Sequence, residues 1–151
     1  MYFKGRGVLK DIKKALELFR LSAEQGFYSG QYNLGLHYQI GDGVQQDLKE
    51  AIKWLKLSAE QGDALAQYRL GEMYVKGQGV PEDYKEAIKW YRLAAYQGDA
   101  EAQNNLGYMY YNGLGVPQDY KEAIKWWGLA AEQRNERAQF NLEMMHGNSP
   151  N

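Results

Sequence analysis

The sequence contains no cysteine and only three prolines and two histidines among its 151 residues. Without cysteine there is no disulfide framework, no thiolate metal site and no cysteine nucleophile. The same absence fits a reducing compartment.

An excess of charge of one sign is also missing, since 18 basic residues face 19 acidic residues. A near-neutral chain has no electrostatic basis for binding a phosphate backbone, so we expect no nucleic-acid partner. No apolar run approaches the roughly 20 residues that span a bilayer, and residues 1–10 lack the apolar stretch of a signal peptide. We therefore expect no insertion into a membrane. As the sequence stands, we expect a cytoplasmic location. A periplasmic or secreted location stays open if an N-terminal signal segment has been removed.

A repeat with a step of 36 residues dominates the chain. Its clearest marker is Gly-x-Gly-Val, which begins at Gly5, Gly41, Gly77 and Gly113. The same step separates Gln25, Gln61, Gln97 and Gln133; Ala15, Ala51, Ala87 and Ala123; and Leu34, Leu70, Leu106 and Leu142. A fixed period of this length is typical of solenoids.

Each period predicts two helices, because its apolar residues recur at three-to-four spacing on two faces. Asp47 with Glu50, and their copies, have the spacing of a helix cap, and Gly26, Gly62 and Gly98 stand where helices end. Gly-x-Gly-Val predicts a turn between the two helices in every copy. We expect first helices near 28–39, 64–75, 100–111 and 136–146, and second helices near 12–25, 48–61, 84–97 and 120–133.

The pattern Ala-x-x-x-Leu-Gly-x-Met-Tyr-x-x-Gly-x-Gly-Val-x-x-Asp, which starts at Ala66 and at Ala102, resembles the Sel1-like repeat family. This family is related to tetratricopeptide repeats, and the resemblance covers essentially the whole chain. It implies an all-α, right-handed superhelical solenoid of helix-turn-helix repeats that ends in a capping helix.

We expect a single repeat domain over residues 1–151. It comprises a partial N-terminal repeat (1–26), full repeats (27–62, 63–98 and 99–134), and a capping helix with its tail (135–151). At the 36-residue step, Arg134 replaces the closing glycine, Glu143 replaces the helix glycine and His146 replaces a tyrosine. Such changes are expected in a capping helix, which is covered on one side only. Met1 and Tyr2 align with helical positions of later repeats, so we hypothesise that the sequence is a fragment of a longer array. An in-frame stop codon shortly upstream of Met1 would contradict this hypothesis.

Some residues are expected to pack the repeats together. Tryptophan is the largest apolar residue of the second helix in each full repeat, and small residues would let helix backbones approach closely. The tryptophans are Trp54, Trp90 and Trp126, and the small residues are Gly35, Gly71, Gly107, Ala59, Ala95 and Ala131.

No pattern points to catalysis or to a cofactor. The glycine pairs lack the strand and lysine of a phosphate-binding loop. His37 and His146 lie near opposite ends of the chain, which argues against a shared metal site. The glutamates fit helix starts and exposed faces, and no serine has a nucleophile-elbow motif. We therefore expect no enzymatic activity, no metal and no cofactor.

The positions that vary between repeats are the candidates for binding. In tetratricopeptide proteins the first helices line the concave face, and the resemblance carries that geometry to this chain. Aromatic side chains there would anchor a partner segment, and polar ones would select it. The expected groove residues are Tyr32, Leu36, Gln39, Tyr68, Glu72, Lys76, Asn104, Tyr108, Tyr111, Asn112, Phe140 and Met144.

The leading interpretation is a scaffold or adaptor that holds a peptide or protein segment in this groove. One alternative is a spacer or oligomerisation segment that contacts another copy through the groove or an exposed repeat end. A less favoured alternative is the penicillin-binding or β-lactamase-like activity described for cysteine-rich relatives. This chain lacks their cysteines and any serine-lysine motif of that kind.

Overall fold

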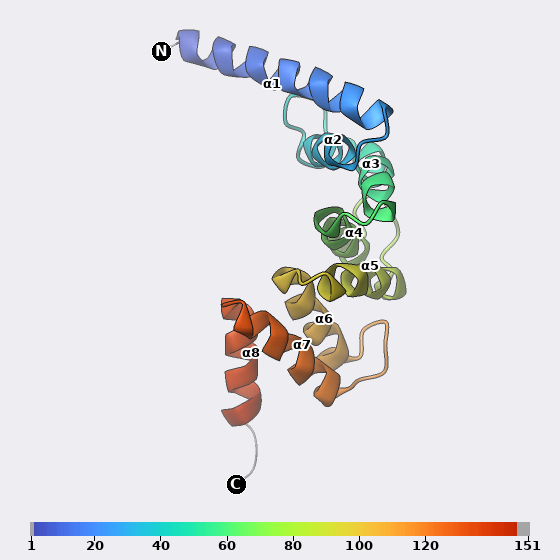
Figure 1. The fold of residues 1–151 in the computed structure, drawn as a ribbon, viewed down its shortest axis with the longest axis vertical. Helices are drawn as coiled ribbons and strands as arrows, with labels where there is room; N and C mark the ends of the chain where they lie inside the picture. Colours follow the sequence, from blue (N-terminus) through green and yellow to red (C-terminus); the bar gives the residue numbers. More distant parts are fainter. Residues whose placement is uncertain (1, 148–151) are drawn as a thin grey trace.

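The computed structural model describes the backbone of residues 2–147, with side chains from residue 11 onward. Figure 1 shows a stack in which each helix packs on the next one along the chain. The eight helices of the described residues are α1 (Tyr2–Glu24), α2 (Tyr28–Ile40), α3 (Leu48–Glu60), α4 (Ala64–Lys76), α5 (Tyr84–Tyr96), α6 (Ala100–Asn112), α7 (Tyr120–Glu132) and α8 (Glu136–Gly147). These residues include no strand, which confirms the all-α solenoid. The expectations for Met1 and for the tail at 148–151 lie outside the described residues.

Aspartate caps begin the second helix of each full repeat. Asp47 accepts hydrogen bonds from the backbone N–H groups of Lys49 and Glu50, each at 3.1 Å. Asp83 and Asp119 make the same pair of bonds at the starts of α5 and α7. Because the first turn of a helix leaves N–H groups without partners, these carboxylates fix where each helix starts. The caps predicted from the sequence are confirmed.

The turn between two helices of a repeat depends on both glycines of Gly-x-Gly-Val. The first closes the helix: Gly77 has a left-handed φ of 65°, and its N–H bonds to the carbonyl of Met73. The second lies against the preceding repeat. A Cβ on Gly79 would lie 2.7 Å from the carbonyl oxygen of Leu48, and a Cβ on Gly115 would lie 2.6 Å from the backbone of Tyr84.

The turn expected at residues 5–8 does not form, and this expectation was wrong. Helix α1 runs without a break over Tyr2–Glu24. In the later repeats the turn packs on the second helix of the preceding repeat, whereas no helix precedes α1 among the described residues. Without that contact the local i to i+4 hydrogen bonds continue the helix through both glycines.

Glycine lets the two helices of each repeat approach closely, as predicted. A Cβ on the glycine of the first helix would overlap a large side chain of the second helix. The nearest distance would be 2.8 Å between Gly35 and Leu55, 2.5 Å between Gly71 and Tyr91, and 2.6 Å between Gly107 and Trp127.

Tryptophan joins one repeat to the next. Trp90 on α5 is buried in the hydrophobic cluster built by α3 and α4, and Trp126 on α7 is buried in the cluster built by α5 and α6. Trp54 is only partly buried against the cluster around Leu16, and its Nε1 donates to Glu50 at 3.2 Å. The tryptophans therefore pack between repeats, most fully in the C-terminal half.

Glutamines form a second connection between repeats. The Nε2 of Gln97 donates to the carbonyl of Gly62 at 2.8 Å and to Oε1 of Gln67 at 2.9 Å. Gln67 is buried, and its own Nε2 donates to the carbonyl of Ala59 at 3.2 Å. Gln61 with Gln31, and Gln133 with Gln103, repeat the arrangement. The sequence marked one set of these glutamines as a repeat signal without indicating this role.

The last helix departs from the earlier first helices. Arg134 adopts a left-handed φ of 64° in the place of the closing glycines. Glu143, which replaces the helix glycine, is exposed, and Ala138 is the only buried residue described in α8. One side of α8 packs on α7, and the opposite side remains open.

Candidate functional site

Helices α6 and α8 present large apolar side chains to solvent. Tyr108 is 53% exposed, Phe140 is 61% exposed and Met144 is 51% exposed. A hollow of about 470 Å³ lies between the two helices, and a second hollow of about 230 Å³ adjoins it. Tyr108, Phe140 and Asn141 line both hollows and so form the wall that they share.

A third hollow of about 300 Å³ continues this surface toward α4. Glu72 and Lys76 line it together with Tyr108, so Tyr108 borders all three hollows. We term the three together the C-terminal groove. The residues of the groove used below are Glu72, Lys76, Asn104, Asn105, Tyr108, Tyr111, Asn112, Trp127, Glu136, Arg137, Phe140, Asn141, Met144 and Met145.

Two thirds of the expected groove residues lie on this surface. They are Glu72, Lys76, Asn104, Tyr108, Tyr111, Asn112, Phe140 and Met144. Tyr32, Leu36, Gln39 and Tyr68 line none of the three hollows. Tyr32 packs against the core of α3 and α4, Leu36 is partly buried, and the carbonyl of Gln39 accepts a bond from Gln46 at 2.9 Å.

Tyr68 is partly a core residue. Its ring centroid lies 6.1 Å from that of Tyr91, and its hydroxyl donates to Oε1 of Glu72 at 2.9 Å. Burial raises the pKa of Tyr68, and the hydrogen bond to Glu72 raises it further. Replacing Tyr68 would therefore change the packing of α4 on α5, and it would remove the hydrogen bond to Glu72, which lines the third hollow.

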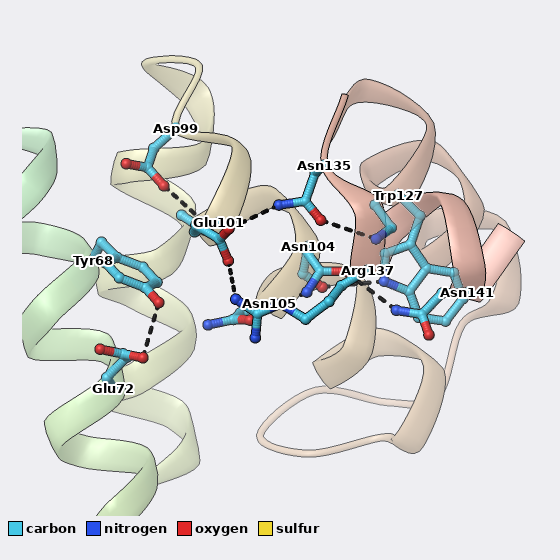
Figure 2. A network of polar contacts seen from close by, with 12 residues as sticks. Tyr68, Glu72, Asp99, Glu101, Asn104, Asn105, Trp127, Asn135, Arg137 and Asn141 are labelled. Carbon is cyan, nitrogen blue, oxygen red and sulfur yellow. Dashed lines mark hydrogen bonds and ion pairs between the residues drawn. The ribbon is translucent and has the colours of Figure 1, made fainter. Parts of the chain in front are cut away.

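Asn104 lines the hollow of about 470 Å³ and is buried, with 5% of its surface exposed. Its carbonyl accepts a bond from Nε1 of Trp127 at 3.1 Å, and its Oδ1 accepts one from Nδ2 of Asn141 at 3.2 Å. Figure 2 shows Trp127 and Asn141 on the same side of Asn104. Asn104 therefore links α6 to both α7 and α8.

An ion pair closes one side of the same hollow. Arg137 at the start of α8 pairs with Glu101 on α6, and Glu101 also accepts a bond from Nδ2 of Asn135 at 3.0 Å (Figure 2). The Oδ1 of Asn135 caps α8 by accepting the N–H of Ala138 at 2.9 Å. This network fixes how α8 sits against α6.

Sequence reasoning missed several residues of the groove. Asn105, Trp127, Glu136, Arg137, Asn141 and Met145 were not among its candidates. One signal was present in the repeat itself. Position 104 is aromatic in the other repeats, as Tyr32, Tyr68 and Phe140, and the missing ring marks where space opens between α6 and α8.

Among the residues with described side chains, no three histidine, cysteine, aspartate or glutamate residues are grouped so that they could hold a metal ion. None of the helices described in the structure is both long and apolar enough to pass through a membrane.

The Sel1 repeat family model matches residues 1–27, 29–63, 64–99 and 100–135. The chain belongs to the Sel1 repeat family. Sel1 repeat proteins are generally protein-interaction scaffolds, and their fold is typically non-enzymatic. No curated protein sequence matches this one.

Solved structures of bacterial Sel1 repeat proteins resemble the chain closely. A protective antigen of uropathogenic Escherichia coli strains, which displays an SLR fold, is 44% identical over 90% of this chain, with a TM-score of 0.88. A Sel1 repeat protein from Oxalobacter formigenes is 39% identical over 86% of this chain, with a TM-score of 0.82. The Helicobacter pylori cysteine rich protein B is 26% identical over 87% of this chain, with a TM-score of 0.67, and the match covers 94% of that protein. This chain spans 29% of the Escherichia coli protein and 54% of the Oxalobacter protein.

Proposed function

We propose that this Sel1 repeat chain is a non-enzymatic binding module whose C-terminal groove holds a segment of another protein. The observation that carries the proposal is the pair of adjoining hollows that share Tyr108 and Phe140 as a wall. Two pockets on either side of an aromatic ridge can receive neighbouring side chains of one peptide segment.

The composition of the groove suits recognition of a protein. Exposed aromatic side chains and methionine give large contact area, and residues of this kind are enriched where proteins bind. The ridge residue Tyr108 lies on a helix fixed from both sides, because α6 packs on α5 and α7. A surface that is already formed loses little conformational entropy when it binds, which favours affinity.

Polar groups at the edge of the groove would select among partner segments. Lys76 is exposed beside the third hollow, and Asn112 is exposed beside the second. The Nδ2 of Asn112 donates to the carbonyl of Tyr108 at 3.0 Å, which leaves its Oδ1 for a donor of the partner.

The experiment that tests this function is affinity capture from a lysate of the source organism, followed by mass spectrometry. The groove variant is Tyr108→Ala/Phe140→Ala. The matched control is Phe27→Ala/Tyr28→Ala at the start of α2. Phe27 is 59% exposed and Tyr28 is 53% exposed, so the control removes the same two ring types at similar exposure.

We expect a protein that is captured by the unaltered chain and by the control but lost with the groove variant. Equal capture by all three would contradict the proposal. Loss with the control alone would place binding at the other end of the solenoid. If the captured protein is the chain itself, with a mass in solution that rises with concentration, the chain is an oligomerisation segment instead.

A further inference from the structure

The amide groups that line the hollow of about 470 Å³ form a chain of hydrogen bonds that runs in one direction. The Nδ2 of Asn141 donates to Oδ1 of Asn104 at 3.2 Å, and the Nδ2 of Asn104 approaches Oδ1 of Asn105 at 3.5 Å. Burial raises the pKa of Tyr91, and a side-chain hydrogen bond from Asn105 opposes that rise. Both of these amide donations run from Asn141 through Asn104 to Asn105.

The outer end of this chain is an acceptor. Oδ1 of Asn141 receives no hydrogen bond from any described residue, and Asn141 lines both hollows of the α6–α8 part of the groove. A ligand in either pocket could donate a hydrogen bond to this amide oxygen, which otherwise has no described donor. The free acceptor at Asn141 therefore favours a partner side chain that carries N–H groups.

The space beside these amide groups exists because position 104 lacks a ring. Asn104 stands where other repeats have Tyr32, Tyr68 and Phe140, and the hollow of about 470 Å³ opens beside it. Tyr108 and Phe140 form its aromatic walls. Ring faces attract cations, and they stack best with the planar guanidinium of arginine.

The charges around the hollow also favour a cation. Among the described residues that line it, Arg137 is the sole cation, and it is already paired with Glu101. Glu136 also lines the hollow, and no described cation pairs with it. Glu143 lies seven residues further along α8, about two helical turns away, and is likewise exposed without a described ion pair. A basic side chain entering here would meet the unpaired carboxylate of Glu136, the amide oxygen of Asn141 and two aromatic rings.

We propose that this hollow binds an arginine side chain of the partner segment, and that the adjoining hollow binds a neighbouring apolar side chain. The second pocket suits the apolar group because Trp127, Met144 and Met145 line it. This inference rests on the proposed function and adds the chemistry of the partner: a segment in which an arginine lies within one helical turn of a large apolar residue.

Selection from a phage-displayed library of random 12-residue peptides on the full chain tests this chemistry. A parallel selection uses Tyr108→Ala/Phe140→Ala, and only peptides that depend on the groove are synthesised. We expect these peptides to share an arginine next to, or within four positions of, leucine, methionine or an aromatic residue. Replacing that arginine with citrulline keeps its shape and removes its charge, and should weaken binding at least tenfold.

Glu136→Gln should weaken the same peptide about threefold to tenfold, whereas Glu132→Gln, an exposed glutamate at the end of α7, should leave affinity unchanged. Groove-dependent peptides without a basic residue, or equal binding of the citrulline peptide, would overturn this inference and leave the proposed function standing. If no peptide depended on the groove, both would be contradicted.

Discussion

A side chain at position 107 would overlap Trp127, which fills the space in front of it. A Cβ on Gly107 would lie 2.6 Å from the indole ring and 3.1 Å from the carbonyl oxygen of Ala123. Gly128 on α7 offers the opposite case, since a Cβ there meets nothing within 4 Å. The same substitution should therefore have opposite effects at two helical glycines.

Gly107→Ala should lower the free energy of unfolding by about 1–3 kcal/mol, because the packed helices must move apart. Gly128→Ala should raise it by about 0.5–1 kcal/mol, because alanine restricts the unfolded chain and suits a helix better. Urea unfolding followed by circular dichroism measures both. A stabilising Gly107→Ala would show that α6 and α7 do not pack as closely as described.

Besides the hydrophobic core, pairs of glutamines connect neighbouring repeats, and we term these pairs the glutamine ladder. They are Gln31 with Gln61, Gln67 with Gln97, and Gln103 with Gln133. Gln97→Ala removes the bonds to the carbonyl of Gly62 and to Oε1 of Gln67, and it leaves a buried amide oxygen without its donor. We expect a loss of about 1–3 kcal/mol in the free energy of unfolding. Chemical denaturation of the variant measures this loss.

Gln25 provides the matched control. It occupies the same repeat position as Gln97, but its side chain is exposed and makes no described hydrogen bond. Gln25→Ala should change stability by no more than about 0.5 kcal/mol. Similar losses from Gln25→Ala and Gln97→Ala would mean that the ladder does not stabilise the junction between repeats.

Most helices were predictable because their signals are local. Asp47 caps α3 through its own neighbours, and Gly77 ends α4 through its own φ, so the repeat pattern located both. The start of α1 was not predictable in this way. In the later repeats the second glycine of the turn packs on a preceding helix, a tertiary contact that the repeat pattern does not reveal.

The groove was predictable in part, for the same reason. The first helices carry most of it, and Tyr108 and Phe140 were identified as varying positions. The burial of Asn104 and the position of Tyr68 on Tyr91 depend on how large the facing side chains are. Periodicity predicts on which face of a helix a residue lies. How deeply that residue is buried depends on the side chains that pack around it.

Alkaline pH acts on the whole molecule through its buried tyrosines. Burial raises the pKa of Tyr91 and of Tyr68 above the ordinary value of 10.0. Above pH 10 the unfolded chain therefore loses protons that the folded chain keeps, and the free energy of unfolding falls as the pH rises. Below pH 10 these groups contribute no dependence on pH.

Urea unfolding at pH 8, 10.5 and 11 measures this slope. Tyr91→Phe removes the more deeply buried of the two phenols from the titration and should flatten the decline above pH 10. An unchanged slope in that variant, or stability that rises above pH 10, would contradict the burial of Tyr91.

We propose that the solenoid binds its partner at the C-terminal end. The NMR signals of its methionines can report where the partner binds. Met144 and Met145 line the C-terminal groove, whereas Met73 is fully buried in the core of α3 and α4. Methyl groups of methionine give separate signals in NMR spectra of a chain labelled with ¹³C-methyl methionine. Single substitutions assign each signal.

Titrating such a labelled chain with the captured partner, or with a groove-selected peptide, is the most direct measurement. We expect the Met144 and Met145 signals to shift with saturation while the Met73 signal stays in place, and Phe140→Ala to weaken the shifts at equal ligand concentration. Shifts that leave Met144 and Met145 unchanged at saturation would show that the partner binds elsewhere on the solenoid.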